Sequence, residues 1–133
     1  MEENAEGGAV MTTDNNKKIL LVDDEEDILI PIKMTLEDIG FKVDIFTNPL
    51  LALSNFKTSY YDLAILDIKM PGMNGFELSD KIKKIDDTIK VTFFTATDTP
   101  YPSKDYQNVM DKKKFIIKPI SLDEMINQVK MQL

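Results

Sequence analysis

The feature that most constrains this chain is a regular alternation of short apolar runs with segments of helical periodicity. Apolar runs typical of β-strands lie at 19–22, 41–46, 63–66, 91–94 and 115–117. Apolar residues at helical spacing follow them at 28–39, 49–56, 76–85, 106–110 and 122–129, the last with Ser121 as its N-cap. Because strict alternation of strand and helix favours a parallel sheet covered by helices on both faces, we expect one α/β domain with a doubly wound, five-stranded parallel sheet.

The hydrophobic pattern of the runs also indicates how the strands are ordered. The runs at 19–22, 63–66 and 91–94 read as continuously apolar, as expected for the interior of a parallel sheet. The run at 41–46 alternates polar and apolar residues, so we place it at an edge. The order 2-1-3-4-5 satisfies both patterns and makes the first and third strands neighbours where the order reverses. Ligands of such sheets bind outside the carboxyl ends of the strands at that point.

The amino-acid composition limits the chemistry that this edge can carry. The 133 residues include no His, Cys or Trp, and all 16 basic side chains are Lys. This composition excludes a Ser–His–Asp triad, a thiolate nucleophile and a bidentate arginine clamp on phosphate. Carboxylates, hydroxyls and ammonium groups remain, so any metal should be a hard ion with oxygen ligands, such as magnesium or manganese.

The charge balance and the amino-terminal segment bear on partners and location. The chain carries 16 basic and 23 acidic side chains, a net charge of −7. Because such a surface repels nucleic acid and anionic lipid, we expect direct contact with neither. No apolar run approaches the ~20 residues of a membrane span, and no signal segment is recognisable, so we place the chain in the cytoplasm. Residues 1–17 are acidic and poor in apolar side chains, which predicts a mobile tail ahead of a domain at 18–133.

Polar side chains of a few types stand at the carboxyl ends of the predicted strands. Asp23 and Asp24 follow the first strand, Asp67 ends the third, Thr95 the fourth and Lys118 the fifth. Because these ends share one edge of the sheet, the side chains should converge there. Crowded carboxylates raise one another's pKa unless a cation joins them, and magnesium accepts such oxygen ligands. An aspartate can also attack phosphorus and form an aspartyl phosphate, whose oxygens Lys118 and Thr95 would contact.

Taken singly, several of these residues also fit purely structural roles. Asp24 could cap the helix that follows it, Asp67 could be a turn residue, and Lys118 could be a solvated lysine ahead of a turn proline. A chance arrangement is the weaker interpretation, because each of these residues stands at the carboxyl end of a separately predicted strand.

The motifs in their order carry a resemblance to a known family. Asp23-Asp24, Asp67 with 70–72 (Met-Pro-Gly) and Gly75, 95–96 (Thr-Ala), and 118–119 (Lys-Pro) resemble the receiver domain of two-component response regulators. The resemblance covers 18–133 and implies a flavodoxin-like, or receiver, topology. It also implies a signalling module rather than an enzyme: a phospho-acceptor switch that assists only its own phosphorylation and dephosphorylation.

The resemblance implies a role for each of the acidic residues at the strand ends. Asp67 would accept a phosphoryl group from a sensor histidine kinase or a phosphotransfer protein, and Lys118 would contact that group together with Thr95. Magnesium, with manganese as a second possibility, would be held by Asp23, Asp24, Asp67 and the backbone carbonyl of Lys69.

Further implied roles concern switching, dephosphorylation and output. Thr95 and Phe115 would be the switch residues, although a core aromatic side chain on the last strand is an equally good interpretation of Phe115. Lys69 and Thr97 would flank the approach of an attacking water and so tune dephosphorylation. An output partner of unknown identity would contact the fourth helix, the fifth strand and the last helix, and Pro100 and Pro102 predict that the fourth helix is short.

Three other functions fit the fold less well. A flavin carrier needs a Ser-, Thr- or Gly-rich phosphate loop after the first strand, where this chain has acidic residues. A phosphatase with an aspartate nucleophile needs an acid two residues after Asp67, where Lys69 stands. A receiver domain that serves only as a binding scaffold typically lacks an acid, the Thr or the Lys, and all are present here.

Overall fold

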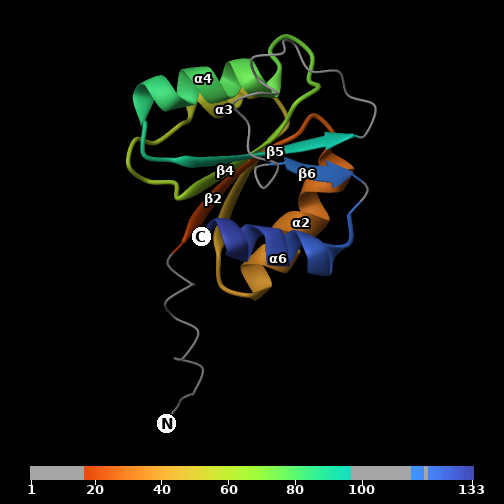
Figure 1. The fold of residues 1–133 in the computed structure, drawn as a ribbon. Helices are drawn as coiled ribbons and strands as arrows, with labels where there is room; N and C mark the ends of the chain where they lie inside the picture. The colour runs from red at the N-terminus through yellow and green to blue at the C-terminus, as the bar shows by residue number, and fades with distance from the viewer. Residues whose placement is uncertain (1–16, 97–114, 119) are drawn as a thin grey trace.

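The computed structural model describes residues 17–96, 115–118 and 120–133. Five parallel strands form one sheet in the order β3-β2-β4-β5-β6, which is the predicted order 2-1-3-4-5 in chain order (Figure 1). The strands are β2 (Lys18–Val22), β3 (Lys42–Phe46), β4 (Leu63–Asp67), β5 (Lys90–Ala96) and β6 (Phe115–Lys118). The predicted fold is confirmed, including the edge position of β3, whereas the tail at 1–16 and the predicted helix at 106–110 lie outside the described residues.

Helices cover both faces of the sheet, as the alternating pattern predicts (Figure 1). The described helices are α2 (Glu26–Asp38), α3 (Pro49–Ser54), α4 (Gly75–Ile85) and α6 (Leu122–Gln132). α3 and α4 lie on one face, and α2 and α6 lie on the other. None of the helices that the structure describes combines the length and the apolar content of a membrane span.

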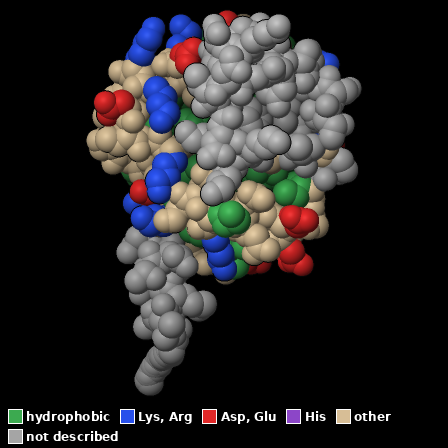
Figure 2. Space-filling model, in the orientation of Figure 1, with side chains coloured by type: hydrophobic (Ala, Val, Ile, Leu, Met, Phe, Trp, Pro, Cys, Tyr) green, Lys and Arg blue, Asp and Glu red, His purple; other side chains and the backbone are tan. Residues whose placement is uncertain are grey.

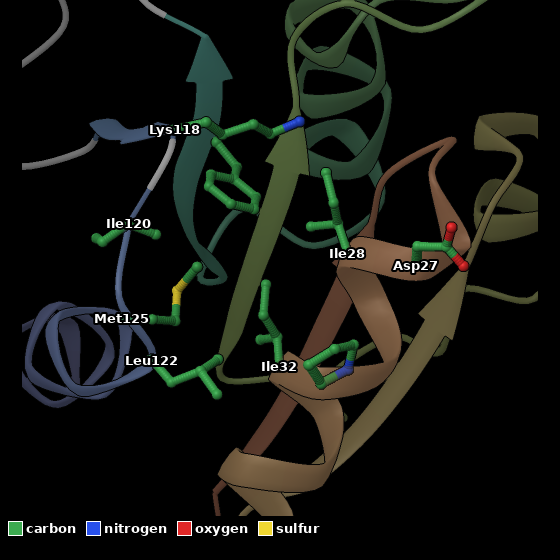
Figure 3. Close-up of a pocket in the computed structure, with 9 residues that line it drawn as sticks. Asp27, Ile28, Ile32, Lys118, Ile120, Leu122 and Met125 are labelled. Carbon is green, nitrogen blue, oxygen red and sulfur yellow. The ribbon is translucent and has the colours of Figure 1, made fainter.

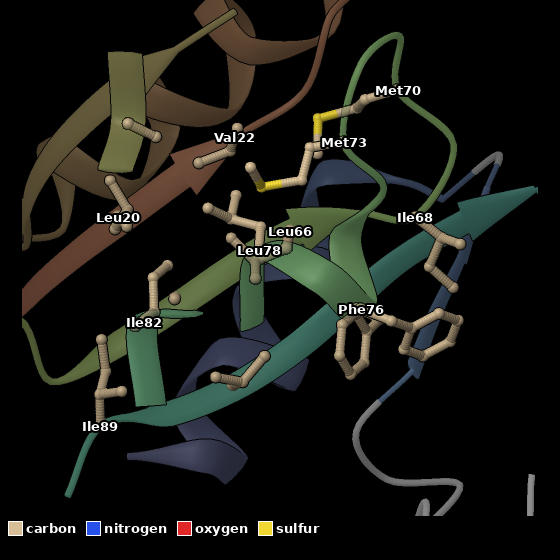
Figure 4. Packing of buried hydrophobic residues seen from close by; sticks show 14 of the residues in the cluster. Leu20, Val22, Leu66, Ile68, Met70, Met73, Phe76, Leu78, Ile82 and Ile89 are labelled. Carbon is tan, nitrogen blue, oxygen red and sulfur yellow. The ribbon is translucent and has the colours of Figure 1, made fainter. Parts of the chain in front are cut away.

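The core divides into two layers because successive strand residues point to opposite faces. Leu20 packs in the layer beneath α3 and α4, and its neighbour Leu21 packs in the layer against α2 and α6. Figure 4 shows the first layer, in which the rings of Phe76 and Phe93 lie 4.7 Å apart between centroids. β2 and β4 are buried on both faces, so the residues that end these strands are held rigidly at the edge of the sheet.

Side chains at the helix termini define where the helices begin. Asn74 and Glu77 form a reciprocal capping box at the start of α4, with hydrogen bonds of 2.9 and 3.0 Å. The predicted cap of the last helix is confirmed, because the Ser121 hydroxyl accepts the backbone N–H of Glu124 at 3.1 Å. α4 therefore begins at a defined residue directly behind the end of β4, which positions the loop that follows Asp67.

Candidate functional site

The carboxyl ends of β2, β4 and β6 bring three charged side chains together. Val22 pairs with Leu66 in the sheet, so Asp23 and Asp67 follow on neighbouring strands. Asp23 is fully buried and Asp67 is 4% exposed. Lys118 ends β6, on the far side of β5, and its long side chain reaches back toward both carboxylates. The site thus holds two buried acids and one shared ammonium group.

Lys118 is the centre of the electrostatic contacts at this edge. Its Nζ lies 2.8 Å from Asp23 Oδ2 and donates a hydrogen bond of 3.4 Å to Asp67 Oδ1. Glu25 Oε1 lies 3.9 Å from the same nitrogen, and the ring of Phe94 lies beneath it at 4.7 Å. Without a bound ligand, the ammonium group therefore belongs more to Asp23 than to the presumed acceptor Asp67.

The pKa values follow from this arrangement. Burial first, and the charge of Asp23 second, raise the pKa of Asp67 from 3.8 to about 7, although Lys118 acts in the opposite direction. Burial alone would lower the pKa of Lys118, but its hydrogen bonds and attraction to the two aspartates raise the pKa overall. One ammonium group does not neutralise two buried carboxylates, so the site favours the arrival of a further cation.

A divalent cation is the ligand that the donor atoms fit. Carboxylate oxygens of Asp23, Asp24 and Glu25 lie within 4.8 Å of one another, and hard cations such as magnesium bind oxygen donors at this kind of spacing. The sequence motifs do not single out Glu25 as a site residue. Its position directly after Asp23-Asp24 is the one feature that could indicate it. Asp67 is not part of this tight group, and its carboxylate accepts a hydrogen bond from Lys118.

Asp24 is not the N-cap of α2, so the interpretation of Asp24 as a capping residue is wrong. The N-cap of α2 is Glu25, and its side chain makes no capping hydrogen bond. Instead, Asp23 Oδ1 accepts the backbone N–H of Glu25 at 2.9 Å. Asp24 is exposed and faces the open cavity, where it remains available as a ligand.

The presumed acceptor faces a cavity of about 540 Å³. The side chains and loop residues that line it are Asp24, Glu25, Asp67, Lys69, Met70, Pro71 and Lys118. Lys69 is exposed at its rim, so the structure brings this predicted residue to the site. A cavity of this size and polarity has room for a hydrated metal ion and a phosphoryl group.

Two glycines shape the loop that supports Asp67. Gly72 has a φ of +85°, a left-handed conformation that other residues adopt at a cost. A Cβ added to Gly75 would lie under 3.0 Å from the carbonyl oxygen of Asp67, and the N–H of Gly75 donates to Ile68 O at 2.9 Å. α4 can therefore begin against the backbone of Asp67 only with glycine at 75, which explains this part of the motif.

The remaining predicted residues lie at the border of the described structure or beyond it. Thr95 belongs to β5, and its backbone pairs with Ile117 of β6, one position before Lys118. Phe115 begins β6 and pairs with Phe93. The side chains of Thr95 and Phe115, and all of Thr97, lie outside what the structure describes. The backbone register nevertheless puts Thr95 at the predicted edge of the sheet.

An apolar groove adjoins the polar cavity on the other side of Lys118. It has a volume of about 280 Å³ and lies between α2 and the segment leading into α6 (Figure 3). Ile28 and Ile32 face Ile120 and Met125 across it, and Leu122 lies at its border with 40% of its surface exposed. An incoming partner can therefore bury apolar side chains immediately beside the charged site.

Comparison with known proteins places this geometry in a family. Residues 19–130 match the family model of the response regulator receiver domain. The response regulator receiver protein CpdR of Brucella abortus is 30% identical over 98 residues, which cover 74% of this chain and 81% of that protein. Sensor protein EvgS of Escherichia coli is 35% identical over 65 residues, and there the match spans only 5% of the relative.

Solved structures agree with the sequence relatives. The response regulator protein TrrA of Thermotoga maritima in complex with Mg²⁺ and BeF is 31% identical with a TM-score of 0.67, covering 88% of this chain and 99% of that one. TrrA in complex with the histidine kinase ThkA is 35% identical with a TM-score of 0.71, covering 88% and 98%. Because the family model matches most of the chain and the buried acids and Lys118 stand where the motifs predict, this chain belongs to the response regulator receiver domain family.

Proposed function

We propose that Asp67 is the phosphoacceptor of this receiver domain. The observation that carries the proposal is the shared ammonium group: Lys118 contacts both Asp67 and the buried Asp23 at the edge of a cavity. Asp67 faces that cavity with a carboxylate that has one described cationic partner, while Asp23 lies fully buried behind it. An incoming phosphoryl group therefore meets Asp67 rather than Asp23.

The transfer needs one bond to form and one to break. An oxygen of Asp67 attacks the phosphorus of a phosphohistidine, the P–N bond breaks, and its electron pair returns to the imidazole of the donor. Lys118 leaves Asp23 and pairs with the phosphoryl oxygens, and the hydroxyl of Thr95 donates to another of them. The reactive group stays on the protein, so the domain acts as a signalling switch and not as an enzyme with a separate substrate.

The metal ligands in this proposal are Asp23, Asp24, Asp67 and the backbone carbonyl of Lys69, with Glu25 as an additional nearby carboxylate. The clustering of acidic oxygens after β2 supports it. When bound, magnesium would neutralise the carboxylates and the phosphoryl oxygens, and manganese would do the same with the same ligands. The carboxylates themselves would position the acceptor oxygen.

The phosphodonor in this proposal is a histidine kinase or a phosphotransfer protein. TrrA, which resembles this chain, is described in a complex with a histidine kinase. The apolar groove beside Lys118 supports such docking, since it offers Ile28, Ile32 and Leu122 next to the reacting group. The proposal includes a cytoplasmic location, where a kinase has access to ATP. It also includes an output partner that contacts β6, α6 and the predicted fourth helix. Thr95 and Phe115 are the proposed switch residues.

Intact mass measured after incubation with magnesium and a small phosphodonor tests the acceptor. The wild-type chain and an Asp87→Asn control should gain one phosphoryl group, because Asp87 is exposed at the opposite end of the molecule. Asp67→Asn should gain none, and wild type with a chelator should gain none either. Phosphorylation of Asp67→Asn to the level of the control would refute the assignment.

Magnesium titration of Asp24→Asn tests the metal ligands separately. The affinity should fall at least tenfold relative to wild type, because a direct carboxylate ligand is lost. Asp87→Asn should bind magnesium as the wild type does. Equal affinity in Asp24→Asn and wild type would remove Asp24 from the ligand set while leaving the acceptor assignment to the mass experiment.

A further inference from the structure

Charge is unevenly distributed between the two ends of the sheet. At the end where the strands begin, called here the amino edge, lysines start three of the five strands: Lys42 in β3, Lys18 in β2 and Lys90 in β5. The last turn of α4 adds Lys83 and Lys84 to the same edge. Figure 2 shows lysine side chains gathered along the margin of the molecule where α4 ends and β5 begins.

The helix termini largely follow this separation of charge, although α2 has no basic residue in its last turn. Each helix begins at the carboxyl edge of the sheet, and three of the described helices carry acidic residues in their first turn. α4 and α6 end at the amino edge with lysines in their last turns. Both placements suit the helix dipole. A chain with a net charge of −7 thus presents a basic surface at the edge opposite its acidic site.

Two of the acids at the amino edge, Asp86 and Asp62, are engaged by hydrogen bonds, and Asp87 is exposed there. Both oxygens of Asp86 accept hydrogen bonds, from the backbone N–H of Ser59 at 2.9 Å and from Thr88 at 2.6 Å. Asp62 accepts the backbone N–H of Lys18 at 2.9 Å. Within the part of the chain that the structure describes, Lys42, Lys84 and Lys90 are exposed and have no ion-pair partner. Their ammonium groups are available to an external anion.

A hollow lined by both polar and apolar residues lies within the same surface. Its volume is about 400 Å³, and it lies where α4 ends, β5 begins and α6 ends. Lys83 and Lys90 stand at this hollow, and Ile89, Val91 and Met131 contribute apolar surface. Met131 is 67% exposed, so its side chain is accessible at this hollow. The surface therefore combines positive charge with a place for one apolar side chain.

We propose that the amino edge is a docking surface for an extended acidic protein segment that carries an apolar side chain. Lys42 and Lys18 begin neighbouring strands about 5 Å apart, and Lys90 begins β5 beyond β4, an arrangement that suits carboxylates at intervals along an extended chain. A nucleic acid is the weaker fit, since the chain has no Arg for forked phosphate or base contacts. Because the edge lies opposite Asp67, the segment binds without blocking the phosphodonor.

Titration of the isotope-labelled full chain with the peptide Glu-Glu-Leu-Glu-Glu tests the proposal by amide NMR. Shifts should concentrate at the starts of β2, β3 and β5, and they should weaken as salt is added. Lys42→Glu and Lys90→Glu should each bind about fivefold more weakly. Lys81→Glu is the matched control, with the same charge change at an exposed position of α4 before its last turn, and it should bind as the wild type does. Equal weakening in all three variants, or absence of shifts at this edge, would overturn the proposal.

Three further arms decide the class of the ligand. The peptide with Ser in place of Leu should bind several-fold more weakly, because the hollow then stays unfilled; equal affinity would overturn the apolar part of the proposal. A single-stranded oligonucleotide or an anionic vesicle that binds this edge more tightly than the peptide would overturn the protein segment as the ligand. A triple variant that combines Glu2→Gln, Glu3→Gln and Glu6→Gln is compared with wild type in the absence of peptide. If its amide signals differ at this same edge, the occupant is the chain's own amino-terminal segment and the proposal of an external partner fails.

Discussion

Two buried aspartates at opposite edges of the sheet have opposite electrostatic environments. Asp67 at the carboxyl edge is 4% exposed, and Asp86 at the amino edge is 6% exposed. Burial and the neighbouring Asp23 raise the pKa of Asp67 to about 7. The pKa of Asp86 is lowered, first by the hydrogen bond from the Thr88 hydroxyl and then by the backbone N–H groups of Ser59 and Thr88. Similar exposure of the whole residue therefore does not fix the charge state of its carboxyl group: desolvation dominates at Asp67, and hydrogen bonds dominate at Asp86.

The hydrogen-bond donors available to the two carboxyl groups also differ. Asp86 has donors for both oxygens, and it joins the loop around Ser59 to the turn before β5. Ser59 has a φ of 58°, so this aspartate also holds a backbone conformation that serine rarely adopts. Asp67 shares its one described ammonium partner with Asp23. The amino edge thus uses its acid for stability, and the carboxyl edge keeps its acid available for a cation or a phosphoryl group.

Removing Lys118 should sharpen this contrast most. In chelator at pH 8, Lys118→Ala should lose about 3 kcal/mol of unfolding free energy, because two buried carboxylates lose their shared cation. Lys57→Ala should lose less than about 1 kcal/mol, since its contact with Asp44 at 3.8 Å is exposed. Urea denaturation measures both, and magnesium should restore more stability to Lys118→Ala than to wild type. Equal losses in the two variants would show that the buried pair is already neutral.

Replacing a glycine of the β4–α4 loop should have the next largest effect on the free energy of unfolding. Gly75→Ala should cost about 2 kcal/mol, because its methyl group displaces the backbone of Asp67. It should also weaken magnesium binding. Gly72→Ala is the control: it costs about 1 kcal/mol for the left-handed conformation, but nothing lies within 4 Å of its Cβ, so magnesium affinity should not change. Loss of magnesium affinity in both variants would assign the effect to the loop as a whole.

Most of the fold follows from local patterns in the sequence, and so does the position of the site. The continuous run at 63–66 and the polar residue after it predict a central strand ending in Asp67, because burial on both faces demands apolar residues throughout. Side-chain pairing does not follow in this way. Lys118 lies nearer to Asp23 than to Asp67, which depends on rotamers and on the packing over Phe94 rather than on sequence spacing.

Residues far apart in sequence set the other features that the patterns do not predict. Ser59 and Asp86 meet through the tertiary fold, and neither residue type signals that contact. Ile85 fits the helical period that predicts a buried face of α4, but it is the last residue of the helix and is 45% exposed. Local patterns therefore predict elements and their order, while the electrostatics of the site require the three-dimensional arrangement.

Neutralising the two aspartates should change stability in opposite directions. In chelator above pH 7, Asp67→Asn should gain on the order of 1 kcal/mol, because it removes a buried charge that the fold disfavours. The folded protein holds the Asp67 proton up to about pH 7 and the unfolded chain only to about 3.8. Raising the pH between these values therefore removes stability from the wild type relative to Asp67→Asn, and the difference stays constant above pH 7.

Asp86→Asn provides the opposite case in the same measurement. Its stability should fall relative to wild type at neutral pH, because an amide replaces a carboxylate that accepts hydrogen bonds from Ser59 and Thr88. The loss should disappear in acid, once the wild-type carboxyl group is itself protonated. Denaturant titrations from about pH 2 to 8 separate the two curves. Curves of the same sign would show that burial rather than hydrogen bonding governs both aspartates.

The smallest expected effect concerns the lifetime of the phosphoryl group on Asp67. Hydrolysis requires a water in line with the bond to Asp67, approaching through the cavity. Lys69 is exposed at the rim of that cavity, and it is a cation with a long, flexible side chain. It can lie over the phosphoryl oxygens and close the approach, and it has no carboxylate or amide group with which to orient a water.

We therefore expect slow loss of phosphate in wild type, faster loss in Lys69→Ala, and the fastest loss in Lys69→Asn, whose amide can hold a water. The differences should be a few-fold, corresponding to about 1 kcal/mol in the barrier. Loss of the phosphoryl mass over time measures the rates, with Lys81→Ala as a control at an exposed lysine of α4 that does not line the cavity. A rate in Lys69→Ala equal to wild type would mean that this side chain points into solvent and that the geometry at Asp67 alone sets the lifetime.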